Sequence, residues 1–187
     1  MTISGASGVY SNAYNFLSFV STGVDPRTGT YSCNFSLSNL LANTLSGPSI
    51  PLVLGFNSLQ SDDLGFGKGW GLQLSNFNRK TGKLSLSDGA SHMATVGTSS
   101  FVLKDKKVKD LKTSRSGRDL LIEHKSGILE VLSSHSSSAD QWLVSKIYSS
   151  EGRVIHFDYG WAAGRSNLLA VRDESRRLLT IDRSSNL

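Results

Sequence analysis

The sequence predicts an all-β protein made of antiparallel hairpins, arranged as a curved sheet or as a partial β-shell or sandwich behind a short apolar N-terminal segment. Apolar and polar residues alternate with a period of two along most of the chain, and clusters of Gly, Asn, Asp and Ser bound these runs. Helical periodicity is limited to residues 10–20. At 187 residues the chain is long enough to bury one sizeable core.

The first half contains an apolar lead-in or plug over residues 1–23, followed by the first strands of a β domain over residues 24–187. Alternation predicts strands over residues 30–37, 50–56, 71–77 and 83–87. In the first of these strands one face would carry Tyr31, Cys33, Phe35 and Leu37. Residues 78–82 and the pair Asp88-Gly89 are typical of tight turns, so the last two strands should form hairpins.

The second half contains three predicted hairpins of similar design. The paired strands are residues 120–124 with 128–132, residues 142–147 with 153–159, and residues 168–172 with 177–181. Their turn centres are Gly127, Gly152 and Ser175, which lie 25 and 23 residues apart. This spacing indicates a weak repeat of one supersecondary unit.

Charge is concentrated in one stretch of the chain. The net charge of the chain is +5. Residues 104–118 hold seven cations and two anions, so the net charge of this stretch alone is also +5. Lys106, Lys107 and Lys109 are therefore candidates for a binding surface. No aromatic residues are interleaved with them and no nucleic-acid fold motif accompanies them, so the pattern does not favour nucleic acid as a partner, and a solvated turn is the simpler interpretation.

No combination of residues predicts an enzyme or a cofactor site. The four histidines lie at no metal-ligand spacing, the single Cys33 excludes an internal disulfide, and no acid, base and nucleophile come together. The pairs Asp62-Asp63 and Asp173-Glu174 stand in turn-like contexts. The first residues have no basic n-region and no long apolar stretch, so they do not predict a signal peptide, and no segment has the length predicted for a membrane span.

The three tryptophans leave two alternatives open. Trp70, Trp142 and Trp161 each fall in or beside a predicted strand, where an indole either packs in the protein or presents an aromatic surface to a ligand. Packing is the simpler interpretation. The alternative is a carbohydrate- or protein-binding β module, with Trp142 and Trp161 on its binding surface.

The run Gly65–Gly71 places a glycine at every second position, with Lys68 among them. A phosphate loop needs Ser or Thr directly after the lysine and a helix behind it, whereas Gly69 and an alternating apolar pattern follow here. The run is therefore predicted to begin a strand, with its glycines on one face. We expect alanine at Gly67 or Gly69 to impair folding instead of ligand binding.

Three stretches, in this order, resemble the Rhs/YD-repeat family, which includes bacterial Rhs toxins, toxin-complex subunits and teneurin-like proteins. The first, residues 24–32, carries Asp25, Arg27, Thr28 and Gly29. The second, residues 64–74, carries Gly65, Gly67, Gly69 and Trp70. The third, residues 149–182, carries Gly152, Arg153, Asp158 and Tyr159, although Glu174-Ser175-Arg176 stands where a second Gly-Arg turn would be expected.

The resemblance implies that the chain is the N-terminal region of such a protein, with YD-like hairpins from about residue 118. The repeats of the family wind into a hollow β-shell that encloses a C-terminal toxin. The chain would then be a non-enzymatic structural segment that forms or caps this shell. Its partners would be the remainder of the shell or a toxin-delivery protein, with self-association through sheet edges. It would reside in the bacterial cytoplasm before export by a specialised secretion route.

Overall fold

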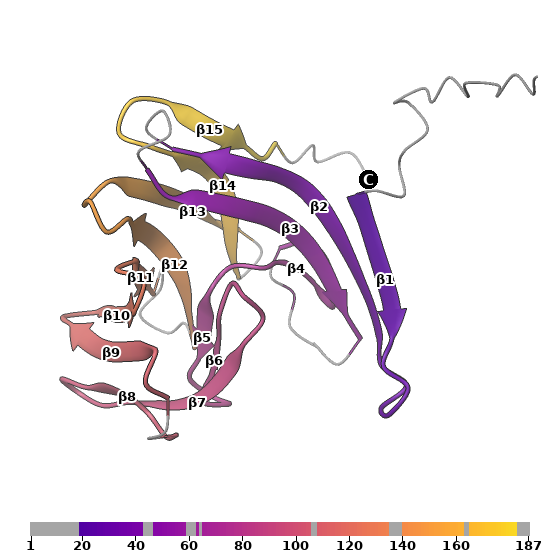
Figure 1. Cartoon of the computed structure of the whole chain (residues 1–187), viewed down its shortest axis with the longest axis horizontal. Helices are drawn as coiled ribbons and strands as arrows, with labels where there is room; N and C mark the ends of the chain where they lie inside the picture. Colours follow the sequence, from indigo (N-terminus) through magenta and orange to yellow (C-terminus); the bar gives the residue numbers. More distant parts are fainter. Residues whose placement is uncertain are drawn as a thin grey trace, which may run out of the picture.

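The computed structural model describes residues 19–42, 47–58, 63, 65–105, 108–134, 140–162 and 165–182 (Figure 1). Within these ranges the regular elements are fifteen strands, β1 to β15, all paired antiparallel. The predicted all-β class is therefore confirmed. Residues 1–18, which include most of the predicted lead-in, lie outside the described residues.

The first sheet has the order β1-β2-β3-β4. Its strands are β1 (Val20–Val24), β2 (Tyr31–Leu41), β3 (Ser49–Asn57) and β4 (Trp70–Leu72). All of strand β1 except Val24 falls within residues 1–23, the stretch assigned to the lead-in. The strand was not predicted, because its sequence Val-Ser-Thr-Gly-Val carries few apolar residues. It pairs along its whole length with β2.

A β-bulge in β2 corrects one predicted face. Ser36 pairs with Val53 and Ser38 pairs with Leu52, so Leu37 is an extra residue without a partner in the ladder. Its side chain is 52% exposed. Cys33 and Phe35 share a face as predicted, but the bulge shifts the alternation by one, and Leu40 continues the buried face in place of Leu37.

The second sheet has eleven strands and branches at β12. Its strands are β5 (Asn76–Asn78), β6 (Lys83–Ser85), β7 (Ser91–Val96), β8 (Phe101–Leu103), β9 (Leu111–Ser116), β10 (Asp119–His124), β11 (Leu129–Ser133), β12 (Gln141–Tyr148), β13 (Val154–Ala162), β14 (Arg165–Arg172) and β15 (Arg177–Thr180). The start of β12 pairs with β5 and its end pairs with β13, while β11 takes the opposite edge.

Eight of these strands curl into a nearly closed barrel. From β12 the sheet runs through β5, β6 and β7 to β8 in one direction, and through β11 and β10 to β9 in the other. Thr113 Oγ1 of β9 donates to the Phe101 carbonyl oxygen of β8 at 2.8 Å, and Arg115 of β9 bonds the Gly97 carbonyl oxygen. These side-chain hydrogen bonds bridge the gap between the two edges of the sheet, β8 and β9, where no backbone pairing among the described residues closes the barrel.

The strand predicted over residues 71–77 is wrong, because the chain changes sheets there. Strand β4 ends at Leu72 and belongs to the first sheet, whereas β5 begins at Asn76 and belongs to the second. Leu72 and Leu74 are both 9% exposed and lie in the same core. Their alternation therefore reports burial between the sheets and not a single continuous strand.

The three predicted hairpins of the second half are confirmed. Leu120 pairs with Leu132, Ile147 with Ile155, and Val171 with Leu179. The sequence did not show that β13 continues to Ala162 and forms a further antiparallel pair with β14 from Arg165 onward.

Two hydrophobic cores support these sheets. The first lies between the four-stranded sheet and strands β12 to β14, and it is formed by Leu40, Ala42, Ile50, Leu52, Leu72, Leu74, Val144, Ile147, Ile155, Phe157, Leu168 and Val171. The second fills the barrel, and it is formed by Phe77, Leu84, Leu86, Ala94, Phe101, Leu120, Ile122, Leu132 and Trp142. Strand β12 contributes to both cores, so it joins the sandwich to the barrel.

Candidate functional site

The glycine-rich run is a loop and not the start of an extended strand. Gly65, Gly67 and Gly69 have φ values of +95°, +99° and +78°, in the region that disfavours side chains. The strand begins only at Trp70. The predicted alternation of the glycines on one strand face is therefore wrong, since positive φ values at every second residue are incompatible with a β-strand.

The backbone donors of this loop bind a carboxylate from the chain itself. Asp63 Oδ1 accepts hydrogen bonds from the Gly65 and Gly67 N–H groups at 2.8 and 3.0 Å. Its other oxygen, Oδ2, pairs with Arg165 of β14. Burial alone raises the pKa of Asp63, but the two N–H donors and the Arg165 guanidinium outweigh it and hold the pKa below its ordinary value. The loop thus has the donors of an anion-binding nest, and Asp63 occupies them.

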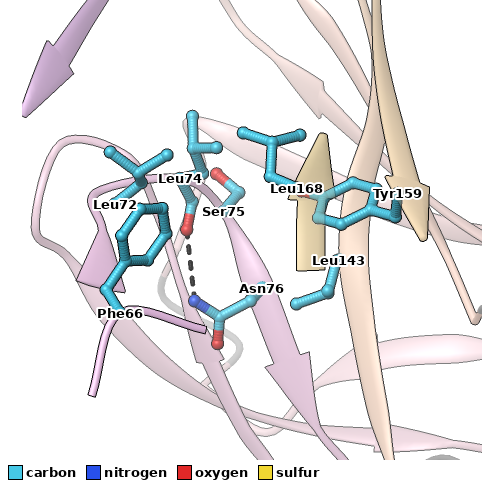
Figure 2. Close-up of a pocket in the computed structure, with 8 residues that line it drawn as sticks. All are labelled: Phe66, Leu72, Leu74, Ser75, Asn76, Leu143, Tyr159 and Leu168. Carbon is cyan, nitrogen blue, oxygen red and sulfur yellow. Dashed lines mark hydrogen bonds between the residues drawn. The ribbon is translucent and has the colours of Figure 1, made fainter. Parts of the chain in front are cut away.

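The same loop meets the YD-like segment at a small cavity (Figure 2). Phe66 of the loop lies on one side, and Tyr159 of β13 and Leu168 of β14 lie on the other. The cavity has a volume of about 30 Å³, far below the roughly 300–1,000 Å³ of small-molecule sites, so it is a packing feature and not a ligand pocket. Burial raises the pKa of Tyr159, which therefore stays a neutral phenol at this seam.

Trp70 is packed in an aromatic cluster. Its ring centroid lies 5.2 Å from that of Phe56 and 5.8 Å from that of Phe35. Gly69 makes room for this cluster, because a Cβ at that position would stand 2.8 Å from Phe56 Cε2 and 3.0 Å from the Asn57 carbonyl oxygen. The Gly-Trp sequence of the loop therefore has a direct structural role.

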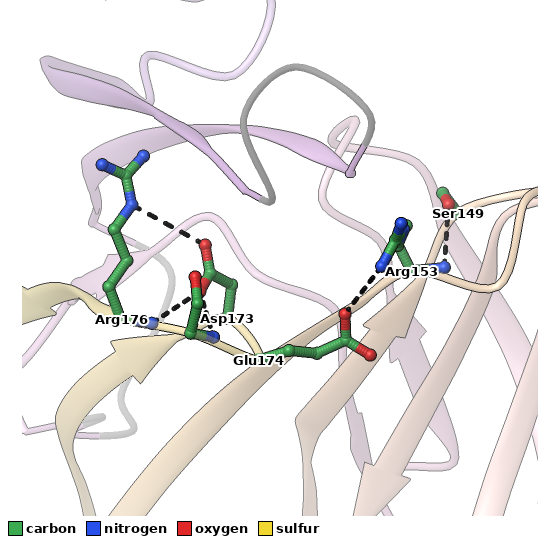
Figure 3. Close-up of polar contacts among 6 residues, drawn as sticks. Ser149, Arg153, Asp173, Glu174 and Arg176 are labelled. Atoms are coloured by element: carbon green, nitrogen blue, oxygen red, sulfur yellow. Dashed lines mark hydrogen bonds and ion pairs between the residues drawn. The ribbon is translucent and has the colours of Figure 1, made fainter.

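Gly152 and Arg153 lie in the turn between β12 and β13. Figure 3 shows Arg153 beside Ser149 in this turn. Gly152 has a φ of +81°, and its N–H donates to the Ser149 carbonyl oxygen at 3.0 Å. Arg153 N–H donates to Ser149 Oγ at 3.2 Å, and its guanidinium lies 3.3 Å from Glu174 Oε2 in the next turn. The ion pair connects two successive hairpins at the same end of the sheet.

The next turn uses a buried aspartate in place of a Gly-Arg pair. Asp173 Oδ1 accepts from Ser175 N, Ser175 Oγ and Arg176 N at 2.8, 2.9 and 2.8 Å. Figure 3 shows the Arg176 side chain turning back toward the Asp173 carboxylate. This turn lacks the Gly-Arg pair of the family that the sequence resembles. Hydrogen bonds to the Asp173 carboxylate hold its backbone in place instead.

The remaining resemblance residues also have structural contacts. Asp25 Oδ1 accepts from Arg27 N at 2.9 Å, and Gly29 adopts a φ of +67° in the turn between β1 and β2. Thr28 Oγ1 donates to Thr30 Oγ1 at 2.8 Å.

Asp158 Oδ2 accepts from Arg172 Nε at 3.0 Å across the pair formed by β13 and β14. The aspartate of the YD-like unit thus faces solvent beside an arginine, while the tyrosine that follows it points into the seam (Figure 2).

The candidate binding-surface residues are not brought together. Trp142 is only 6% exposed in the barrel core, with its indole N–H donating to the Arg118 carbonyl oxygen at 3.1 Å, so it presents no surface to an external ligand. Trp161 is 55% exposed near the end of β13. Lys106 and Lys107 lie outside the described residues, and Lys109 precedes β9.

An ion pair between a partly exposed histidine and a buried glutamate was missed from the sequence. His124 Nε2 lies 2.9 Å from Glu130 Oε1, and the Glu130 side chain is 4% exposed. The hydrogen bond to Glu130 raises the pKa of His124, whereas burial, with Arg172 and Lys146 nearby, lowers the pKa of His156. The signal that could have predicted this pair is Glu130, a charged residue between the apolar residues of β11.

Within the described ranges, no group of three or more His, Cys, Asp or Glu residues could hold a metal ion. Among the same residues no helix combines the length and hydropathy required to cross a membrane.

The comparisons with known proteins show a likeness of fold. No protein-family model matches the chain, and a search of curated protein sequences finds no match. A crystal structure of TcdB2-TccC3 matches with a TM-score of 0.54 at 15% identity, covering 82% of this chain and 10% of that one. The same assembly without its hypervariable C-terminal region gives a TM-score of 0.54 at 14% identity over 81% and 10%.

A structure of the Tc holotoxin pore from Photorhabdus luminescens, with a mutated TccC3, gives a TM-score of 0.52 at 14% identity. It covers 82% of this chain and 10% of the matched chain. The chain therefore spans about a tenth of the length of the toxin-complex chains that it matches. At these identities the likeness concerns the fold, and the fold described above is similar to part of a toxin-complex protein.

Proposed function

We propose that this chain is a non-enzymatic structural segment of an Rhs/YD-repeat toxin protein that forms or caps the β-shell around a C-terminal toxin. The observation that carries the proposal is the likeness of most of the chain to about one tenth of much longer toxin-complex chains. A fold that recurs as a small part of a larger assembly is expected to serve that assembly.

The contacts between the resemblance segments support this role. The glycine-rich loop and the YD-like hairpins are about a hundred residues apart in sequence, yet Asp63 pairs with Arg165, and Phe66 and Tyr159 line one cavity. Several of the characteristic residues join separate strands, as Trp70 does with Phe35 and Phe56 and as Asp158 does with Arg172, while those of residues 25–29 shape a single turn. None of them converges on a solvent-accessible group of acid, base and nucleophile, as catalysis would require.

The sheet edges suggest how the segment joins a shell. Strands β1 and β15 stand at the ends of their sheets, and within the described residues no strand pairs with their outer edges. Unpaired strand edges template further strands. We expect neighbouring shell strands to continue the sheets there, and in their absence we expect self-association. The protein would remain in the bacterial cytoplasm until a specialised secretion route exports the assembled toxin.

Mixing the chain with the shell that it is proposed to complete tests this function. The coding sequence that flanks these 187 codons supplies the shell segment to be expressed as the partner. The two polypeptides should elute together in size-exclusion chromatography with light scattering, and the mixture should melt at a higher temperature than the chain alone. Separate elution with unchanged melting, or flanking DNA that encodes no shell, would contradict the proposal.

A further inference from the structure

A groove with both polar and apolar lining lies between the first sheet and the outer surface of the barrel. Its volume is about 540 Å³, within the range of small-molecule sites. One wall consists of residues from β2, β3, β4 and the link that follows β4. The other consists of residues from β5, β6, the turns on either side of β6 and the start of β12. Figure 1 shows these strands diverging from the point where the chain passes from β4 to β5.

Nine of the seventeen residues that line the groove have neutral polar side chains, and Phe56, Leu72, Leu74 and Leu86 add apolar surface. Six of its seventeen lining residues are amides: Asn34, Asn57, Gln73, Asn76, Asn78 and Gln141. Ser32, Thr81 and Ser85 add hydroxyl groups, and Lys83 is the one charged residue in the lining. Amides and hydroxyls both donate and accept hydrogen bonds, so this surface is suited to a ligand whose groups do the same.

An amide pair stands at the centre of one wall. Gln73 Nε2 donates to Asn34 Oδ1 at 2.9 Å, which joins the end of β4 to β2 across β3. Gly55 of β3 allows this bridge, because a Cβ there would stand 2.9 Å from Asn34 Oδ1 and 3.0 Å from Gln73 Nε2.

The bridge leaves two atoms for a ligand. Within the described part of the chain, the structure gives Asn34 Nδ2 and Gln73 Oε1 no hydrogen bond. The wall therefore presents an amide donor and an amide acceptor from two side chains that are already fixed to each other. Because the bridge holds both amides in place, little side-chain freedom is lost when a ligand binds.

We propose that this groove binds a neutral saccharide, with Asn34 donating to one hydroxyl and Gln73 accepting from its neighbour. Adjacent sugar hydroxyls offer an acceptor and a donor, which complements the two amide groups. The lining contains no carboxylate to neutralise a cation and only Lys83 to neutralise an anion, so charged ligands are disfavoured. This site is separate from the tryptophans considered in the sequence and does not depend on the proposed shell role.

Nuclear magnetic resonance of the ¹⁵N-labelled chain tests the proposal. The probes are maltotriose, cellobiose, lactose, methyl α-mannoside and N-acetylglucosamine, with glucuronate as a charged analogue and a capped Gly-Ser peptide as a non-saccharide. At least one neutral saccharide should shift the Asn34 side-chain NH₂ resonances and the β5 and β6 amides saturably. Asn34→Ala and Gln73→Ala should each weaken binding by about two- to tenfold, the range expected for one neutral hydrogen bond.

Two further variants make the result decisive. Asn34→Asp keeps the oxygen that accepts from Gln73 but removes the NH₂ donor, so it should lose affinity while retaining the fold. Asn39→Ala removes an amide that also makes one hydrogen bond in β2 but lies outside the groove, and it should bind like the parent chain. The proposal is overturned if no neutral saccharide gives saturable shifts, if Asn34→Asp binds normally, or if glucuronate or the peptide binds more tightly.

Discussion

Replacement of Gly69 by alanine gives the sharpest prediction about folding. Gly69 has a φ of +78°, and a non-glycine residue in that region costs about 1–2 kcal/mol. A Cβ would also stand 2.8 Å from Phe56 Cε2 and 3.0 Å from the Asn57 carbonyl oxygen, and such overpacking costs a further 1–3 kcal/mol or so. We therefore expect the free energy of unfolding to fall by about 2–5 kcal/mol.

Gly89 provides a matched control for the backbone contribution. It has a φ of +88°, but a Cβ there would meet nothing within 4 Å. Gly89→Ala should therefore lose only about 1–2 kcal/mol. Asparagine tolerates the left-handed region, so Gly89→Asn should be close to neutral, whereas Gly69→Asn should still be strongly destabilised by its Cβ contact.

Urea unfolding followed by tryptophan fluorescence measures these free energies. For a chain of this length, each kcal/mol also corresponds to a melting-temperature change of about 2–4 °C. If Gly69→Ala and Gly89→Ala lose the same free energy, the close packing of Gly69 against Phe56 and Asn57 has no energetic weight, and the structural role given to the loop is refuted.

Three further predictions concern the charged contacts. Asp63→Asn should lower the free energy of unfolding by about 1 kcal/mol, because it removes the charge that faces Arg165 at a partly exposed site. The folded pKa of Asp63 is lowered, so its contribution is present above the ordinary value of 3.8 and disappears as the pH falls through the lower folded value. Urea unfolding at several acidic pH values should show a shallower pH dependence in Asp63→Asn, and identical curves would contradict this. In histidine NMR titrations, His124 should have a higher pKa than His156, and Glu130→Gln should lower that of His124. The folded pKa of His124 is raised, so its contribution is complete below the ordinary value of 6.5 and disappears as the pH rises through the folded value. A His124 pKa that Glu130→Gln leaves unchanged would refute the pairing.

Local sequence patterns predicted the hairpins because each one is specified by neighbouring residues. Gly127 and Gly152 have positive φ values at turns flanked by alternating strands, so the turn and the pairing are both visible in a short window. The Asp173 turn was harder to interpret, because a buried carboxylate replaces the glycine signal.

Contacts between distant residues could not be predicted in this way. Asp63 and Arg165 are 102 residues apart, and nothing in either local sequence identifies the other as its partner. The change of sheet after Leu72 was hidden because Leu74 is buried in the same core and continues the alternation. The groove was missed for a related reason, since its amides come from strands in two different sheets.

The sequence predicted which residues of the candidate site serve the fold, but it did not predict their backbone conformation or their burial. Gly67 and Gly69 were expected to serve the fold, yet they do so through left-handed backbone conformations in a loop and not as a bare strand face. Trp142 was considered for a surface, but its burial could be known only from the closure of the barrel around it. Period-two alternation predicts that one strand face is buried without identifying what covers it.

Hydrogen exchange at the outer strands tests the proposed shell role most directly. In the isolated chain, the outward-facing amides of β1 and β15 should exchange rapidly, because no strand pairs with those edges within the described residues. In the longer shell protein that the proposal requires, shell strands should pair with at least one of these edges and slow its exchange by more than tenfold. Equal exchange rates at both edges in the two samples would contradict the claim that this chain is a segment of a continuous β-shell.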